Sequence, residues 1–223
     1  MSALRLLLLG APGSGKGTYG KLVAERLHLP VISAGDIVRA SGDARLQAAA
    51  AAGQVGEVAE LVTELVLQEL APAEIGAGGY ILDGFPRTLS QAGALQRAGG
   101  APTSVLHFAM DEEHIVAKLL GRRVCAECGS SYNVVGVFDD ALGVDMPPMP
   151  KRCGCATRDD GNRRADDESE GLIRERLRVY STETAPLIEH YGALGVLQTL
   201  HMRKGLRDLP LIWKRLDALE QEP

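Results

Sequence analysis

The stretch that decides the fold reads Leu6-Leu7-Leu8-Leu9, followed directly by Gly10-Ala11-Pro12-Gly13-Ser14-Gly15-Lys16-Gly17-Thr18. An apolar strand that runs into glycines and a lysine is typical of a phosphate-binding loop. Glycines let successive backbone N–H groups turn inward around one anion, and the helix that follows adds its free N–H groups and the positive end of its dipole. Lys16 reaches the terminal phosphates as a point charge. We therefore expect a nucleoside triphosphate to bind here rather than a plain strand–turn–helix connection.

The residue after the lysine departs from the usual phosphate-loop pattern. Ser or Thr is expected there because its hydroxyl contacts Mg²⁺, whereas this chain has Gly17. The metal must then depend on phosphates, waters and a carboxylate from elsewhere. Asp83 ends the apolar run Tyr80-Ile81-Leu82, and we predict that it holds Mg²⁺ through water. The alternative for such a carboxylate is a helix N-cap.

Composition sets the broad class of the protein. The chain has 223 residues, enough for one large α/β domain with inserted pieces, and 45% of them are hydrophobic. A net charge of −5 argues against a general nucleic-acid binder. Eight arginines nevertheless fall between positions 122 and 176, which suits a phosphate-rich ligand. The apolar runs are too short to span a membrane, so we expect a cytoplasmic chain without membrane or nucleic-acid partners, and a monomer.

Short apolar strands alternate with helical stretches along most of the chain. Helical patterns follow the strands, for example over 88–97 and 112–120. The predicted strands are Leu4–Leu9, Pro30–Ser33, Gly79–Asp83, Ser104–Ala109 and Val196–Thr199. This alternation predicts an α/β fold of three layers, a five-stranded parallel sheet with helices on both faces. The functional site of such a sheet lies at the carboxyl ends of its strands.

Two stretches break this alternation. Residues 41–75 are rich in alanine and read as helical, whereas residues 124–165 carry four cysteines, several prolines and β-prone residues. We interpret them as a helical insert and a small β-rich insert. Both leave and rejoin the main domain, as lids that close over substrates do.

Six segments in order resemble the adenylate kinase family of nucleoside monophosphate kinases. They are Gly-Ala-Pro-Gly-Ser-Gly-Lys-Gly-Thr (10–18), Ser-Ala-Gly-Asp-Ile-Val-Arg (33–39), Asp-Gly-Phe-Pro-Arg-Thr-Leu-Ser-Gln-Ala (83–92), Gly-Arg-Arg-Val (121–124), Arg-Ala-Asp-Asp (164–167) and Thr-Ala-Pro-Leu-Ile (184–188). The resemblance implies reversible transfer of a phosphoryl group from ATP to AMP, giving two ADP. It also implies a P-loop core (1–33, 76–121 and 168–223), a monophosphate-binding helical insert (34–75) and a lid (122–167).

The resemblance assigns roles on the donor side of the site. The loop from Gly10 to Thr18 binds the ATP phosphates, and Lys16 contacts the β- and γ-phosphates. Arg122 contacts the transferring phosphoryl group from the hinge of the lid. Arg164 and Arg176 join it when the lid closes, with Arg163 as a competitor for the first of these. Lys118 stands where the family commonly stacks an arginine on the donor base, and lysine stacks less well.

The acceptor side is assigned in the same way. Arg39 and Arg87 match the arginines that grip the α-phosphate of AMP, and Gln91 matches the glutamine that reads its adenine. Gly84 belongs to the same motif. Ala34 stands near the acceptor base, at the position where adenylate kinases usually have a threonine. The alternative for either arginine is a surface salt bridge.

The four cysteines form two close pairs. Cys125 and Cys128 are followed, 25 residues later, by Cys153 and Cys155. Four thiolates of this kind predict a structural Zn²⁺ site with tetrahedral geometry, and some lids of the family are similar. The second pair is one residue tighter than usual, so Asp159 is an alternative fourth ligand. Reduced thiols that bind nothing are the other alternative.

Three other functions compete with an AMP kinase. A pyrimidine monophosphate kinase shares the fold and the Ser-Ala-Gly at 33–35, but Gln91 and the long lid favour AMP. A nucleotide-binding regulatory protein has little need of arginines converging from separate segments. A zinc-ribbon nucleic-acid module is disfavoured by the acidic charge and the phosphate loop.

Overall fold

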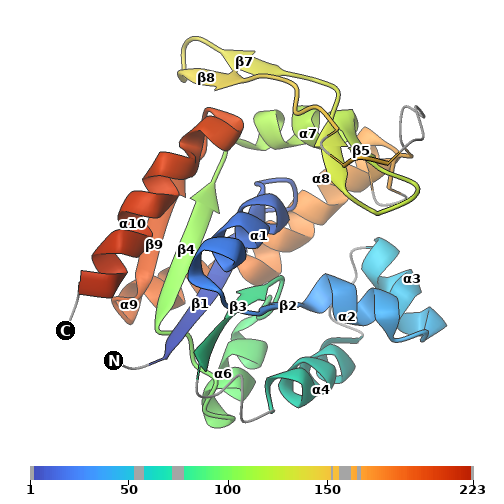
Figure 1. The fold of residues 1–223 in the computed structure, drawn as a ribbon. Coiled ribbons are helices and arrows are strands. Elements are labelled where there is room, and N and C mark those ends of the chain that lie inside the picture. The colour runs from blue at the N-terminus through green and yellow to red at the C-terminus, as the bar shows by residue number, and fades with distance from the viewer. Residues whose placement is uncertain are drawn as a thin grey trace.

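The computed structural model describes residues 3–52, 58–71, 78–151, 153–155, 162–164 and 167–221. Its centre is a five-stranded sheet with the strand order β2-β3-β1-β4-β9, in which all neighbours are parallel (Figure 1). The strands are β1 (Leu4–Gly10), β2 (Val31–Ser33), β3 (Gly79–Asp83), β4 (Ser104–Ala109) and β9 (Leu197–His201). The predicted sheet is confirmed, with strand ends shifted by at most two residues.

Helices cover both faces of the sheet because successive strand side chains point to opposite sides. They are α1 (Lys16–Leu27), α6 (Leu89–Arg97), α7 (Glu112–Gly121), α8 (Glu170–Val179), α9 (Pro186–Ala193) and α10 (Leu209–Gln221). Leu6 and Leu8 of β1 pack with residues of α1 and α10, whereas Leu7 and Leu9 pack with residues of α6 and α9. A third cluster joins the start of the phosphate loop to α7 and α8. The three-layer α/β/α fold is therefore as predicted.

The helical insert follows β2 and lies beside the carboxyl edge of the sheet (Figure 1). Its described helices are α2 (Ala34–Ala40), α3 (Ala44–Ala52) and α4 (Ala59–Leu70). The Ser33 hydroxyl accepts a hydrogen bond from the Asp36 N–H at 3.3 Å and so begins α2. Val62 and Val66 of α4 are buried in the same apolar cluster as β1 and α6, which fixes the insert against the core.

The β-rich insert between α7 and α8 contains two antiparallel pairs, as its composition predicts. The first pairs β5 (Arg122–Val124) with β6 (Ser131–Asn133), and the second pairs β7 (Val137–Asp139) with β8 (Val144–Met146). Val137, Val144 and Met146 of the second hairpin are buried among residues of α1, α10 and β4. This hairpin therefore rests on the core rather than projecting into solvent.

The end of the chain completes the core with two irregular turns. A π-helix, η3 (Tyr180–Thr184), joins α8 to α9, and a 3₁₀ turn, η4 (Gly205–Asp208), precedes α10. Asp145 of β8 donates its N–H to the Arg203 carbonyl at 2.8 Å, just before η4. No helix among the described residues is long and apolar enough to cross a membrane.

Candidate active site

The phosphate loop connects β1 to α1 at the carboxyl edge of the sheet. Gly10, Gly13 and Gly15 have φ values of 150°, 85° and 103°, a region that disfavours side chains. A Cβ atom on Gly13 would lie 2.8 Å from a Leu119 carbon, so α7 leaves no room for one. The N-cap of α1 is Gly15, which has no side chain to cap the helix. The first N–H groups of α1 thus face the loop, as an anion site requires.

Lys16 is held across the loop by backbone carbonyls. Its Nζ donates to the carbonyls of Gly10 and Ala11 at 2.6 and 2.9 Å. The pKa of Lys16 is lowered to about 8, mainly by burial and in part by the cations Arg87, Arg176 and Arg122, whereas Asp83 opposes the shift. The ammonium group is therefore the centre of a cluster of charges from several distant segments.

Two features of the loop fit a bound anion and a metal. The Ser14 hydroxyl is buried and has no hydrogen-bond partner among the described residues, so a phosphate oxygen would satisfy it. A Cβ atom on Gly17 would lie 3.5 Å from an Asp83 carboxylate oxygen. A side chain at position 17 would therefore enter the space next to Asp83, and the glycine keeps that space clear.

Asp83 lies at the end of β3, near several charged side chains. Burial raises the pKa of its carboxyl group, while Lys16, Arg87 and Arg39 act in the opposite direction. Carboxylate oxygens are the ligands that Mg²⁺ prefers, and Mg²⁺ usually retains several waters. The position and chemistry of Asp83 thus fit a water-mediated magnesium ligand.

The predicted acceptor residues gather where β3 and α6 meet. Arg87 donates its Nε to the Gly84 carbonyl at 2.9 Å, and a Cβ atom on Gly84 would be 3.4 Å from the Arg87 guanidinium and 4.0 Å from Ala34. The Gln91 side chain is buried. It accepts from the Arg87 N–H at 2.8 Å and donates to the Ala59 carbonyl at 3.2 Å. Gln91 therefore ties α6 to the helical insert in this conformation.

Arg39 occupies a different environment from Arg87. It lies on the exposed side of α2, and its guanidinium forms an ion pair with Asp36 at 2.5 Å. The surface salt bridge considered as an alternative is therefore present. Arg39 is nevertheless close enough to Asp83 to affect it, because its positive charge is one of those that lower the pKa of the Asp83 carboxyl group.

Two predicted arginines from different elements share one buried carboxylate. Arg122 at the start of β5 donates its Nε to Asp167 at 2.5 Å, and Arg176 on α8 donates to the other oxygen of Asp167 at 2.7 Å. Asp167 is 0% exposed. We assigned no role to Asp167 from the sequence, and its place in the segment 164–167 is the only signal that marked it. The contact fixes both guanidinium groups between the start of the β-rich insert and α8.

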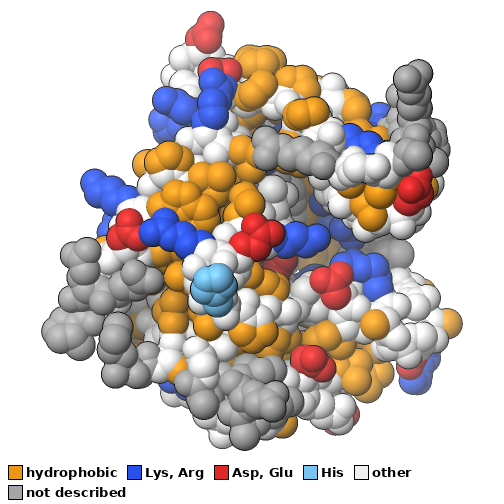
Figure 2. Space-filling model, viewed as in Figure 1, with side chains coloured by type: hydrophobic (Ala, Val, Ile, Leu, Met, Phe, Trp, Pro, Cys, Tyr) orange, Lys and Arg blue, Asp and Glu red, His pale blue; other side chains and the backbone are white. Residues whose placement is uncertain are grey.

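The remaining predicted residues lie around this pair. Arg164 is half-buried, whereas Arg163 is exposed and donates to the Glu168 carbonyl at 3.2 Å. Arg123 donates to the carbonyls of Leu120 and Arg122 and so holds the backbone. On the face shown in Figure 2, Lys and Arg side chains gather beside a hollow between the two inserts.

Lys118 lies on α7 close to the segment that follows β9. The pKa of Lys118 is lowered to about 8, mainly by burial, whereas the nearby Asp208 opposes the shift. Asp208 is itself buried and accepts from the N–H groups of Arg203 and Lys204 at 2.8 and 2.7 Å. Nothing in the sequence marked Asp208, because its partners are backbone groups and a lysine ninety residues away.

The four cysteines lie together in the β-rich insert. Their sulfur atoms are all within 4.8 Å of one another. A tetrahedral metal with sulfur ligands about 2.3 Å away needs sulfurs roughly 4 Å apart, so the cluster fits a four-thiolate site. Cys155 belongs to it despite the tight spacing, and Asp159, the alternative ligand, lies outside the described residues.

A triphosphate loop that faces arginines from several segments, on a parallel α/β sheet, defines a P-loop phosphotransferase. The sequence narrows this class further. The family model for adenylate kinase matches residues 8–196. The chain therefore belongs to the adenylate kinase family and is a nucleoside monophosphate kinase.

Curated relatives agree over almost the whole chain. An adenylate kinase of Rhizobium rhizogenes is 35% identical, covering 97% of this chain and 98% of its own length. One from Fervidobacterium nodosum is also 35% identical, covering 98% and 100%. A probable chloroplastic adenylate kinase of Arabidopsis thaliana is 36% identical, covering 94% of this chain and 72% of its own.

Proposed function

We propose that the cluster at the carboxyl edge of the sheet carries phosphoryl transfer from ATP to AMP, giving two ADP. The observation that supports this most directly is the charge neighbourhood of Lys16, which includes Arg87, Arg122 and Arg176. With Lys16, these cations come from the phosphate loop, the acceptor side, the start of β5 and α8. Phosphoryl transfer needs mainly positioning and charge neutralisation, and a binding protein has no need of such convergence.

Each side of the site has its own task. The loop N–H groups and the Ser14 hydroxyl hold the donor phosphates, with Lys16 on the β- and γ-phosphates. Arg39 and Arg87 hold the phosphate of AMP, whose oxygens are already nucleophilic, so the mechanism requires no general base. Arg122 and Arg176 neutralise charge on the transferring group, and Asp167 keeps their guanidinium groups in place.

The acceptor base would be recognised near the start of α6. Gln91 would exchange its bond to the Ala59 carbonyl for the adenine edge, and Ala34 and Gly84 line the approach. Lys118 contacts the donor base. Arg164 is the further lid arginine rather than Arg163, because Arg163 is exposed and turned to a backbone carbonyl.

Magnesium is the first implied cofactor. Asp83 would hold it through water, beside the space that Gly17 leaves clear. When bound, the ion neutralises charge on the donor phosphates. Burial raises the pKa of the Asp83 carboxyl group, whereas the charges of Lys16 and Arg87 favour its anionic form, which is the form that binds a cation.

Zinc is the second implied cofactor, held by Cys125, Cys128, Cys153 and Cys155. A closed site of four thiolates leaves no position for a substrate, so its role is structural. Metal analysis of the purified protein should find one zinc per chain. Full lid stability and no bound zinc in the unmodified protein would contradict this assignment.

We also propose the division into a core (1–33, 76–121 and 168–223), a monophosphate-binding insert (34–75) and a lid (122–167). Lid closure would exclude water and so prevent hydrolysis of ATP. We propose a monomer that works in the cytoplasm without nucleic-acid or membrane partners. Sedimentation at several protein concentrations tests the oligomeric state.

The decisive experiment is an acceptor panel with ATP as donor. AMP should be phosphorylated much faster than UMP, CMP or GMP, and faster turnover of UMP or CMP would overturn the assignment. Arg87→Ala should lower kcat/KM by roughly a hundredfold or more without unfolding the protein, since a phosphate-gripping guanidinium acts in the transition state. Unchanged kinetics would remove Arg87 from the site.

A further inference from the structure

The segment between β9 and α10, residues 203–208, is held by contacts from three directions. Asp145 of β8 donates its N–H to the first carbonyl of this segment at 2.8 Å. The buried Asp208 carboxylate accepts from two backbone N–H groups of the segment and so fixes its shape. The third contact comes from the other end of the chain, where the Tyr19 hydroxyl donates to the Gly205 carbonyl at 2.8 Å. We call residues 203–208 the 203–208 loop.

Tyr19 lies in the first turn of α1, directly after the phosphate loop, and its side chain is 3% exposed. The ring packs on Phe108 of β4, with the ring centroids 5.3 Å apart. It also covers Gly15 of the phosphate loop, where a Cβ atom would lie 2.6 Å from a ring carbon. One side chain therefore touches the phosphate loop with its ring and the 203–208 loop with its hydroxyl. A phenylalanine would fill the same space without a buried hydroxyl that needs a partner, so the bond to Gly205 is what the tyrosine adds.

The 203–208 loop also lies close to the residue proposed to contact the donor base. Burial raises the pKa of the Tyr19 hydroxyl, and the Asp208 carboxylate raises it further. Burial lowers the pKa of Lys118, and the same carboxylate opposes that shift. A charge has such an effect only over a short distance, so Asp208 is near both side chains. The loop that Tyr19 holds thus carries the acidic neighbour of Lys118.

We propose that Tyr19 is a positioning residue for the donor nucleotide, which holds the 203–208 loop in place relative to the phosphate loop so that the base and the triphosphate bind together. The span between the base and the phosphates of a nucleotide is limited. A loop that moved away from the phosphate loop would leave the two halves of the site aligned for only part of the time, which lowers the apparent affinity. The inference rests on the proposed contact of Lys118 with the donor base.

Tyr19→Phe removes the hydroxyl and keeps the ring contacts with Phe108 and Gly15. The affinity for ATP, measured by calorimetry in the absence of AMP, should fall roughly fivefold, the value of one hydrogen bond. Inorganic tripolyphosphate has no base, so its affinity should remain within about twofold of that of the unmodified chain. An equal loss for both ligands would place the effect in the phosphate loop alone and overturn the proposal. An unchanged affinity for ATP would also overturn it.

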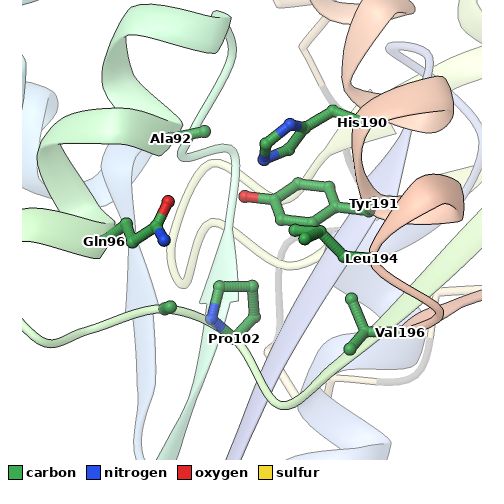
Figure 3. A pocket seen from close by; sticks show the side chains of 8 residues that line it. Ala92, Gln96, Pro102, His190, Tyr191, Leu194 and Val196 are labelled. Carbon is green, nitrogen blue, oxygen red and sulfur yellow. The ribbon is translucent and has the colours of Figure 1, made fainter.

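Tyr80→Phe is the matched control. Tyr80 is likewise 3% exposed, and its hydroxyl donates to a backbone carbonyl, that of Gly100, at 2.5 Å. It packs on the other face of the sheet, in a cluster with Tyr191, whose side chain reaches from α9 toward α6 (Figure 3). This substitution should leave the affinities for ATP and tripolyphosphate unchanged. A fall in ATP affinity as large as that of Tyr19→Phe would reflect a general loss of stability and overturn the proposal.

Amide hydrogen exchange measures the hold on the loop directly. In the ligand-free protein, the N–H groups of residues 203–208 should exchange several-fold faster in Tyr19→Phe than in the unmodified chain, because the loop then opens more often. The same groups should exchange at the unmodified rate in Tyr80→Phe. Unchanged exchange in Tyr19→Phe would show that the bond to Gly205 does not hold the loop, and the proposal would fall.

Kinetics separate this proposal from the proposed function. In Tyr19→Phe, KM for ATP should rise roughly fivefold, while KM for AMP and kcat remain unchanged, because only donor binding is affected. A higher KM for AMP, or a lower kcat at an unchanged KM for ATP, would overturn the role of Tyr19 and leave the kinase function intact. If the unmodified chain failed to phosphorylate AMP, the proposed function would fall, whereas the binding and exchange experiments would still decide the role of Tyr19.

Discussion

Two arginines on α8, only two residues apart, have opposite surroundings. Arg176 faces inward and shares the fully buried Asp167 with Arg122. Arg174 faces outward, is 39% exposed, and pairs with Glu112, Glu113 and Glu170. Two positions on a helix differ by about 200°, which separates the two faces. The comparison shows that ion pairing by itself says little about function, since both arginines are ion-paired but only the inner one lies in the candidate active site.

Removing the inner arginine should have the largest effect. Arg176→Ala should lower kcat by roughly 10²- to 10³-fold, because it deletes a preorganised cation aimed at the transferring group. A coupled assay in both directions measures the loss, and circular dichroism checks folding. Arg176→Lys should recover only a small part of the activity, since a lysine lacks the planar fork. A kcat within twofold of the unmodified enzyme would contradict the inner role.

Removing the shared carboxylate should have the next largest effect. Asp167→Asn leaves two guanidinium groups without their buried anion, which should lower the unfolding free energy by about 3 kcal/mol. The misplaced arginines should also lower kcat by on the order of tenfold or more.

Denaturant unfolding and kinetics at low temperature separate these two effects. Asp167→Glu, which restores the charge, should recover part of both. If Asp167→Asn were destabilised but retained full kcat in the cold, the carboxylate would be a folding element and not a positioning residue.

The charges around Lys16 should also affect the pH dependence of the activity. The pKa of Lys16 is lowered to about 8, so kcat/KM for ATP should fall up to tenfold per pH unit above pH 8 as the charge is lost. Bound phosphates should raise the pKa of Lys16, so the decline in kcat should begin at a higher pH than the decline in kcat/KM. Lys118 titrates in the same range. The arginine in Lys118→Arg remains charged in this range. If kcat/KM of this variant still falls above pH 8, the fall is due to Lys16.

Thermal stability gives the sign that distinguishes this loss from alkaline unfolding. Between about pH 8 and 9.5 an unfolded Lys16 retains a proton that the folded one has released, so this group stabilises the fold as pH rises. Activity should therefore fall while the melting temperature does not. If activity and melting temperature fell together, the loss of activity above pH 8 would be caused by unfolding.

The outer arginine should have the smallest effect. Arg174→Ala should change the unfolding free energy by less than about 1 kcal/mol, because exposed ion pairs are screened by water and salt. Turnover should be unchanged at every pH. A loss of kcat comparable to that of Arg176→Ala would break the distinction between the two faces of α8.

The same distinction explains what the sequence could and could not predict. The phosphate loop was predictable because its strand, glycines, lysine and helix are contiguous, and the cysteine cluster because two close pairs already suggest a shared centre. The bond between Arg122 and Asp167 joins residues 45 positions apart, so only the fold reveals it. Gln91 was chosen from its motif register, but its two internal partners depend on how α4 packs against α6.

The hairpin of β7 and β8 lies in the middle of the β-rich insert and is attached to the core, unlike the segments before and after it. Asp139 contacts His114 of α7 at 3.1 Å, and Asp145 is bonded to the Arg203 carbonyl and the Arg207 side chain, so the middle of the insert is fastened to the core. A closing movement would then involve two separate loops on either side of the hairpin. The cysteine cluster and a backbone bridge between Asn133 and Met149 join those loops. Without a metal on the cysteines, backbone bridges such as that between Asn133 and Met149 would be left to join the two segments, while the hairpin stayed in place.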